Sequence, residues 1–143
     1  MSSCHLAWGR HLNIPLVMVA TTPTMLDWTN EPLGNPVNHA AQPSLFSKAT
    51  TPMNFYERLS NFILTTKLTL SHNYHVREQN HYVWKNFGAH FPSVMELYKD
   101  VSLVLINHHH ALNGIVPFTP AIIPVGGLHI IDSGSALPQV HIL

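Results

Sequence analysis

Twelve histidines are distributed along this chain of 143 residues, and three of them are consecutive at His108, His109 and His110. Neutral imidazole is a common zinc ligand, so these residues raise the question of a metal site. Adjacent side chains at the end of a strand point in different directions, and no Cys pair or HExxH motif accompanies them. The spacing therefore favours polar loop residues, and no metal ligand is predicted.

A second set of polar side chains follows two apolar runs. Thr21 and Thr22 come directly after the run at 14–20, and Asn107 and His108 come directly after the run at 101–106. In open α/β sheets, ligands bind outside the carboxyl ends of the strands. These hydroxyl, amide and imidazole groups could orient a hydroxyl of a bound molecule, or they could cap the strand backbone. The sequence leaves both interpretations open.

Aromatic and sulfur-containing side chains suggest where an apolar pocket would form. Met25 and Trp28 lie in an irregular segment and are the candidates for lining it. Phe55 and Phe62 lie on one stripe of a predicted helix, so core packing is expected for them instead.

The elements that must position these residues follow from the hydrophobic pattern. Apolar runs at 14–20 and 103–106 are typical of strands buried in a parallel sheet, and a short third strand is predicted at 122–125. Gly126 and Gly127 then permit a sharp bend or the close approach of another segment. Prolines and glycines punctuate some thirty residues after the first strand, which is typical of a functional or mobile loop.

Helices are predicted between these strands. Ser3 can cap a short helix over residues 4–12, and Asn54 with Glu57 forms a capping-box pattern that opens a long helix. That helix is expected to continue to about residue 87, where Gly88 supplies a left-handed residue. Ser93 and Glu96 repeat the capping pattern before a short helix. The order of elements predicts an α/β fold that amounts to half of a Rossmann-like sheet.

Composition narrows the classes of function. Charged residues make up only 10% of the chain, whereas about 25% is typical of soluble domains. We therefore expect part of the surface to contact a further domain or other copies of the chain. The seven Lys and Arg residues are scattered, which argues against a nucleic-acid partner. The single Cys4 rules out an internal disulfide.

Several segments, in their order along the chain, resemble the acceptor-binding half of the animal UDP-glycosyltransferases, most closely the insect branch. They include a buried strand that ends in Asn, a loop punctuated by proline, and a Val-Gly-Gly-Leu-His segment. The matching segments are Leu33-Gly-Asn-Pro36, 53–61, Phe87-Gly88, 101–107, Pro117, Pro120, 123–130 and Leu137-Pro138.

The resemblance implies that residues 1–138 are the latter half of the N-terminal, acceptor-binding domain of a GT-B glycosyltransferase, and that residues 139–143 begin the interdomain linker. In the family, the C-terminal domain that binds the UDP-sugar, the catalytic His and the carboxylate that orients that His all lie outside the matching part. No catalytic residue is therefore assigned here, and no cofactor is implied beyond the donor. Full-length relatives carry a signal peptide and a C-terminal membrane helix and face the endoplasmic reticulum lumen. This sequence shows neither feature, so no localisation is predicted.

The implied activity of a complete relative is transfer of glucose or glucuronic acid from a UDP-sugar to a hydroxyl of a small lipophilic acceptor, with inversion at the anomeric carbon. The isolated chain is expected to be inactive, and the alternative is a non-catalytic module that binds small lipophilic molecules. The residues expected to contact the acceptor are Thr21, Thr22, Met25, Trp28, Asn107 and His108.

Overall fold

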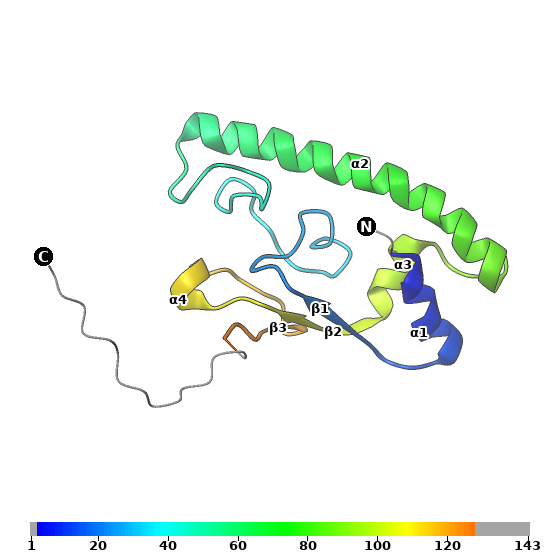
Figure 1. Cartoon of the computed structure of the whole chain (residues 1–143). Helices are drawn as coiled ribbons and strands as arrows, with labels where there is room; N and C mark the ends of the chain where they lie inside the picture. Colours follow the sequence, from blue (N-terminus) through cyan, green and yellow to red (C-terminus); the bar gives the residue numbers. More distant parts are fainter. Residues whose placement is uncertain (1–2, 128–143) are drawn as a thin grey trace, which may run out of the picture.

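A sheet of three parallel strands organises the protein. The computed structural model describes residues 3–127, so the predicted linker at 139–143 and the end of the Val-Gly-Gly-Leu-His segment lie outside the described residues. The strands are β1 (Leu16–Ala20), β2 (Val101–Ile106) and β3 (Ile122–Pro124), in the order β1-β2-β3 (Figure 1). The predicted α/β class is confirmed.

The register of the sheet brings the three carboxyl ends together. Ala20 pairs with Ile106, and Ile106 pairs with Pro124, so the residues that follow each strand emerge at one edge. A register shift lies between Leu16 and Val17 at the start of β1. Because the strands are parallel, long connections must join them, and the connection from β1 to β2 contains both the irregular segment and the longest helix.

The N-terminal helical stretch is present, but its predicted cap is wrong. A 3-10 turn, η1 (Cys4–Leu6), leads directly into α1 (Ala7–Leu12). The side chain of Ser3 makes no capping hydrogen bond. Its hydroxyl instead lies 2.7 Å from the phenolic oxygen of Tyr98, a buried partner far along the chain. A tertiary hydrogen bond has therefore replaced the local one.

Both predicted capping boxes open helices. In α2 (Phe55–Phe87), the amide of Asn54 donates to Glu57 Oε2 at 2.8 Å, and the amide of Glu57 donates to Asn54 Oδ1 at 3.0 Å. Before α3 (Val94–Leu97), the amide of Ser93 donates to Glu96 Oε2 at 3.1 Å. Gly88 ends α2 with a positive φ of 98°, although its ψ of 152° lies outside the left-handed helical region that was predicted. A second 3-10 turn, η2 (Tyr98–Asp100), connects α3 to β2.

The core consists of two clusters of buried side chains. The first joins the N-terminal helices to α3 and to the second half of α2. The second lies against the sheet and consists of Met25, Val104, Ile106 and Ile122. The opposite face of the sheet carries exposed apolar side chains, namely Val17 on β1, Val19 on β1 and Ile123 on β3. Among the described residues, this face of the sheet is therefore uncovered.

The first half of α2 faces inward with its polar side, contrary to expectation. Phe55 is 72% exposed and Phe62 is 57% exposed, so the prediction that they pack in the core is wrong. Asn61 and Thr65 are buried in their place. The reason is that this half of α2 lies against the irregular segment, whose backbone groups need hydrogen-bonding partners. Within residues 3–127, none of the helices has the length and apolar character needed to cross a membrane.

Candidate ligand-binding site

The polar residues predicted at the strand ends do meet at one edge of the sheet. The amide nitrogen of Asn107 donates to the carbonyl oxygen of Ala20 at 3.0 Å, and its side-chain Nδ2 donates to the carbonyl oxygen of Thr21 at 3.2 Å. The hydroxyl of Thr22 donates to the carbonyl oxygen of Thr24 at 2.8 Å. These contacts cap backbone groups, which is one of the two roles that the sequence left open.

His108 is the most enclosed of the predicted site residues, with 3% of its surface exposed. Its Nδ1 lies 2.8 Å from the carbonyl oxygen of Pro23, and its Nε2 lies 3.1 Å from the carbonyl oxygen of Gly114. A carbonyl oxygen only accepts, so the ring nitrogen must carry the proton in each of these hydrogen bonds. The ring also meets that of Phe118 edge-on, with centroids 5.0 Å apart. His108 therefore ties the loops after β1 and β2 together, and its predicted contact with an acceptor stays a prediction.

The predicted close approach at the glycine pair is confirmed. The amide nitrogen of Gly126 donates to the carbonyl oxygen of His108 at 3.0 Å. A Cβ atom built at position 126 would lie 2.5 Å from that oxygen, a distance that side chains do not tolerate. The segment after β3 can therefore cross the end of β2 only with glycine at this position.

The next two histidines, His109 and His110, also contact groups of the protein itself. His109 Nδ1 accepts from the amide of Ala111 at 3.3 Å, at the start of the short helix α4 (His110–Asn113). The rings of His109 and His110 stack on each other with centroids 4.8 Å apart. Across residues 3–127 no group of three or more His, Cys, Asp or Glu side chains could hold a metal ion.

A cavity of about 350 Å³ lies beside the carboxyl edge of the sheet, and we call it the inner cavity. The irregular segment after β1 forms one wall, and the loop after α4 forms the other. Its apolar lining includes Met25, Val37, Leu45 and Phe118. Met25 also belongs to the core cluster against the sheet, so this wall of the cavity is continuous with the core.

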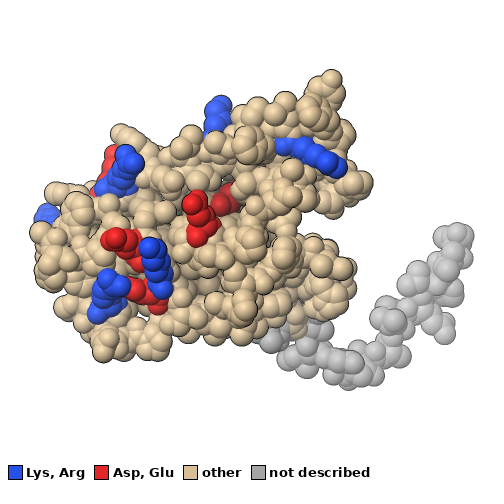
Figure 2. Space-filling view, turned by 180° about the vertical axis from the view of Figure 1, so that it is seen from behind, with Lys and Arg blue, Asp and Glu red and all other residues tan. Residues whose placement is uncertain are grey.

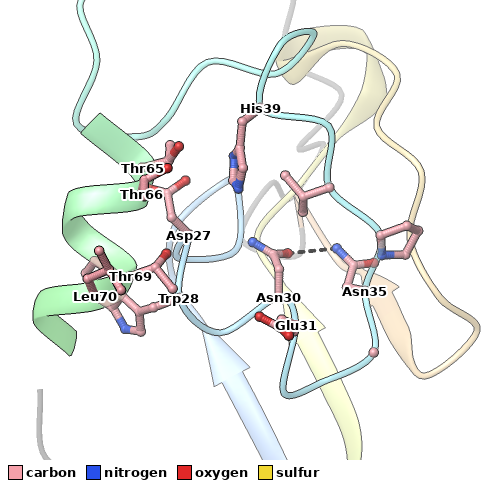
Figure 3. A pocket seen from close by; sticks show the side chains of 13 residues that line it. Asp27, Trp28, Asn30, Glu31, Asn35, His39, Thr65, Thr66, Thr69 and Leu70 are labelled. Carbon is pink, nitrogen blue, oxygen red and sulfur yellow. Dashed lines mark hydrogen bonds between the residues drawn. The ribbon is translucent and has the colours of Figure 1, made fainter. Parts of the chain in front are cut away.

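A second cavity, of about 580 Å³, lies between the same segment and α2, and we call it the helix cavity. The threonines 65, 66 and 69 of α2 line one side, and Asn30 and Asn35 line the other (Figure 3). The two cavities share a wall made of Asp27, Asn30, Asn35, Val37 and His39. They therefore adjoin, and the shared residues separate them.

Trp28 lines the helix cavity, as a pocket residue was predicted to do, but its ring also packs within the protein. It stacks on His72 with centroids 5.1 Å apart and on Phe46 with centroids 5.9 Å apart. Burial of His72 lowers its pKa below the usual 6.5, and a charge on His75 acts in the same direction. Among residues 3–127 the buried Nε2 of His72 has no hydrogen-bond partner, and its ring lies nearly parallel to the indole.

Asn61, which is 1% exposed, holds the irregular segment against α2. Its Oδ1 accepts from the amide of Ser44 at 2.8 Å, and its Nδ2 donates to the carbonyl oxygens of His39 at 2.7 Å and Gln42 at 3.0 Å. The hydroxyl of Ser44 in turn donates to Asp27 Oδ2 at 2.6 Å. One side chain of α2 thus fixes the backbone that forms the shared wall.

A pair of buried amides holds the other end of the wall. Asn35 Nδ2 donates to Asn30 Oδ1 at 2.8 Å, and the amide of Thr119 donates to Asn35 Oδ1 at 3.1 Å. The sequence reasoning missed both networks. The available signal was that Asn35 and Asn61 lie inside two of the segments that carry the family resemblance, with no role assigned to them.

The charge on the lining of the helix cavity is uniformly negative. Asp27 and Glu31 line it, and no Lys or Arg does so. Figure 2 views the protein from behind relative to Figure 1. It shows acidic side chains in a hollow near the centre of that view, with Lys and Arg side chains farther out. Such a lining disfavours a carboxylate or phosphate on a ligand, because like charges repel more strongly where water is partly excluded.

The protein is an α/β unit with a parallel sheet, a cavity beside the carboxyl edge of that sheet and a second cavity against α2. In sequence the chain is similar to UDP-glycosyltransferases, and the predicted resemblance to that family is confirmed as a partial match. A UDP-glycosyltransferase of Dactylopius coccus is 34% identical over 124 residues, which are 85% of this chain and 23% of the relative. A UDP-glucosyltransferase of the same organism is 27% identical over 131 residues, which are 90% of this chain and 25% of the relative.

The similarity extends to a second organism. A Caenorhabditis elegans protein whose name places it among the UDP-glucuronosyltransferases is 28% identical over 123 residues, covering 81% of this chain and 22% of that protein. The chain thus spans about a quarter of the length of the curated relatives that it matches. No family model matches the chain. No solved structure matches it.

Proposed function

We propose that this chain supplies the acceptor-binding part of a UDP-glycosyltransferase. Similarity to such enzymes over 85% of the chain supports the family, and the parallel sheet is of the kind that a GT-B fold uses. In this proposal residues 1–138 form part of the N-terminal domain, and 139–143 lead into the interdomain linker. The UDP-sugar binds to a separate C-terminal domain.

The reaction proposed for the complete enzyme is a direct displacement at the sugar. A general base removes the proton from the acceptor hydroxyl, and the resulting oxygen attacks the anomeric carbon of glucose or glucuronic acid while UDP leaves with the bonding electrons. The configuration at that carbon is inverted. The base and the donor site are contributed from outside these residues, so this chain contributes acceptor binding and orientation.

The observation that carries the proposal is the inner cavity. Its volume of about 350 Å³ falls within the usual range for small-molecule sites, roughly 300–1,000 Å³, and it lies where ligands bind in open α/β sheets. Met25 and Phe118 give it an apolar side, as a small lipophilic acceptor requires. Thr21, Thr22, Trp28, Asn107 and His108 complete the proposed acceptor-binding set around the two cavities and the strand ends.

A binding experiment tests the cavity directly. We expect 1-naphthol to bind the chain in isothermal titration calorimetry and expect Val37→Phe, which fills the inner cavity, to abolish binding with an unchanged circular dichroism spectrum. Val17→Phe is the matched control, because Val17 lies on the exposed face of β1 at 54% exposure. Equal affinities for the wild type and Val37→Phe would contradict the proposal.

A chimera separates transfer from binding alone. The chain replaces its matching segment in the Dactylopius coccus UDP-glycosyltransferase, and transfer to 1-naphthol is measured with UDP-glucose and with UDP-glucuronic acid. Glucosylation or glucuronidation of 1-naphthol supports the acceptor-binding role. A folded chimera that binds 1-naphthol without transferring sugar supports the alternative, a non-catalytic module for small lipophilic molecules.

A further inference from the structure

The side chain of His39 is the one imidazole that lines both cavities. It belongs to the wall that they share. Figure 3 shows that its ring lies between the threonines of α2 and the pair formed by Asn30 and Asn35. Within residues 3–127 no protein group forms a hydrogen bond with this ring. Both ring nitrogens are therefore available to a ligand, in contrast to those of His108, which face two backbone carbonyl oxygens.

The backbone of His39 is fixed although its ring is free. Asn61, which is 1% exposed, donates to the carbonyl oxygen of His39 at 2.7 Å and anchors Gln42 and Ser44 next to it. A side chain on an anchored backbone loses less conformational entropy on binding a ligand than one on a mobile loop. The position is thus prepared for a contact with a ligand.

The surroundings of His39 select the chemistry of that contact. Asp27 lines both cavities, Glu31 lines the helix cavity, and no Lys or Arg lines either of them. A neutral imidazole offers one N–H donor and one acceptor nitrogen, which match the oxygen and the proton of a hydroxyl. A carboxylate on the ligand would instead meet negative charge from the same wall.

We propose that His39 is the hydrogen-bonding anchor for the hydroxyl of the bound molecule, which selects alcohols and phenols over carboxylic acids. The inference rests on the proposed acceptor-binding function and adds a residue and a selectivity to it. The apolar body of the ligand lies in the inner cavity against Met25 and Phe118. Its hydroxyl lies at the shared wall, next to His39.

The test is a cycle that removes the hydroxyl from the ligand and the imidazole from the protein. Calorimetry with the full chain compares 1-naphthol with naphthalene, for the wild type and for His39→Leu. We expect His39→Leu to weaken 1-naphthol binding by about 2- to 10-fold and to leave naphthalene binding unchanged, because one hydrogen bond to the hydroxyl is lost. His39→Gln retains a donor and an acceptor and recovers most of the affinity. His81→Leu is the matched control, since His81 is exposed on α2 and lines neither cavity.

The same assay tests selectivity. We expect 1-naphthoate to bind at least about 10-fold more weakly than 1-naphthol and Glu31→Gln to narrow that difference, because a charge is removed from the lining of the adjoining helix cavity. If 1-naphthol binds but His39→Leu leaves its affinity unchanged, or weakens both ligands equally, the inference about His39 is overturned and the acceptor-binding proposal stands. If the folded wild-type chain binds neither ligand, both are overturned.

Discussion

Gly126 lies directly against the backbone of His108, with its amide nitrogen 3.0 Å from the carbonyl oxygen of that residue. The side chain of His108 contacts the carbonyl oxygens of Pro23 and Gly114. The last residues of the described chain are thereby coupled, through one residue, to both loops that border the inner cavity.

A methyl group at position 126 has no room. We expect Gly126→Ala to lower the free energy of unfolding by about 1–3 kcal/mol, the usual cost of forcing extra atoms into a packed site. Urea denaturation measures this loss, and NMR shows whether the amides of Thr22 and His108 shift. Gly34→Ala is the comparison for backbone strain without a clash, because Gly34 has a positive φ of 67° but nothing within 4 Å of a built Cβ. An unchanged midpoint for Gly126→Ala would refute the steric argument.

Asn61 offers a second test, because three backbone groups depend on its amide. Asn61→Ala leaves these groups without their partner, and each buried unsatisfied group costs about 1–3 kcal/mol. We expect a loss of more than about 2 kcal/mol in urea denaturation and faster hydrogen exchange at the amide of Ser44. Ser60→Ala, one residue away on the exposed side of α2, should change neither quantity. Slow exchange at Ser44 in Asn61→Ala would show that another group holds the segment.

The buried His72 predicts how stability depends on pH. Burial lowers its pKa in the folded protein below the unfolded value of 6.5, so the unfolded chain binds this proton more readily. Stability is therefore unaffected by this group well above 6.5 and falls as the pH drops through 6.5 towards the folded pKa. Urea denaturation at several pH values measures this slope.

A ring without a titrating nitrogen isolates the contribution of His72. His72→Phe keeps a ring against Trp28, and we expect it to reduce the loss of stability on acidification. His81→Gln removes an exposed histidine from the same helix and should leave the slope unchanged. Identical slopes for the wild type and His72→Phe would show that other histidines set the acid sensitivity.

An exposed and a buried side chain of α2 should differ in how much they contribute to the free energy of unfolding. Phe62 is 57% exposed, so Phe62→Ala should change the free energy of unfolding by no more than about 0.5 kcal/mol. Val83 is 1% exposed in the core, and Val83→Ala should cost about 1–3 kcal/mol because it leaves a cavity. Thermal or urea unfolding measures both. A loss for Phe62→Ala as large as that for Val83→Ala would mean that the face is covered in solution.

The sequence predicted those features that depend on local pattern. The three strands, the two capping boxes and the length of α2 follow from apolar runs and from residue pairs three positions apart. The approach of Gly126 to another segment followed from glycine chemistry alone. These signals are local, because each is contained within a few residues of the element that it specifies.

The errors and omissions concern contacts between distant segments. Ser3 matches a capping residue, but its hydroxyl binds Tyr98, and no local pattern contains that pairing. The periodicity of Phe55 and Phe62 located a stripe correctly but could not tell which side of α2 would meet a loop that needs polar partners. Asn61 and His39 were missed for the same reason, since an isolated amide or imidazole has no period and its role depends on what folds beside it.

The contacts at the carboxyl edge of the sheet join segments that are far apart in the sequence. The bond from Thr119 to Asn35 spans 84 residues, the contact from His108 to Pro23 spans 85, and the bond from Asn107 to Thr21 spans 86. Pairing of β1 with β2 closes a loop of the same length, since Ala20 pairs with Ile106, and it brings these groups within reach of one another. The cavities therefore depend on the pairing of these two strands. Any variant that slows the joining of the two strands will delay the formation of the cavities, even when every residue that lines them is intact.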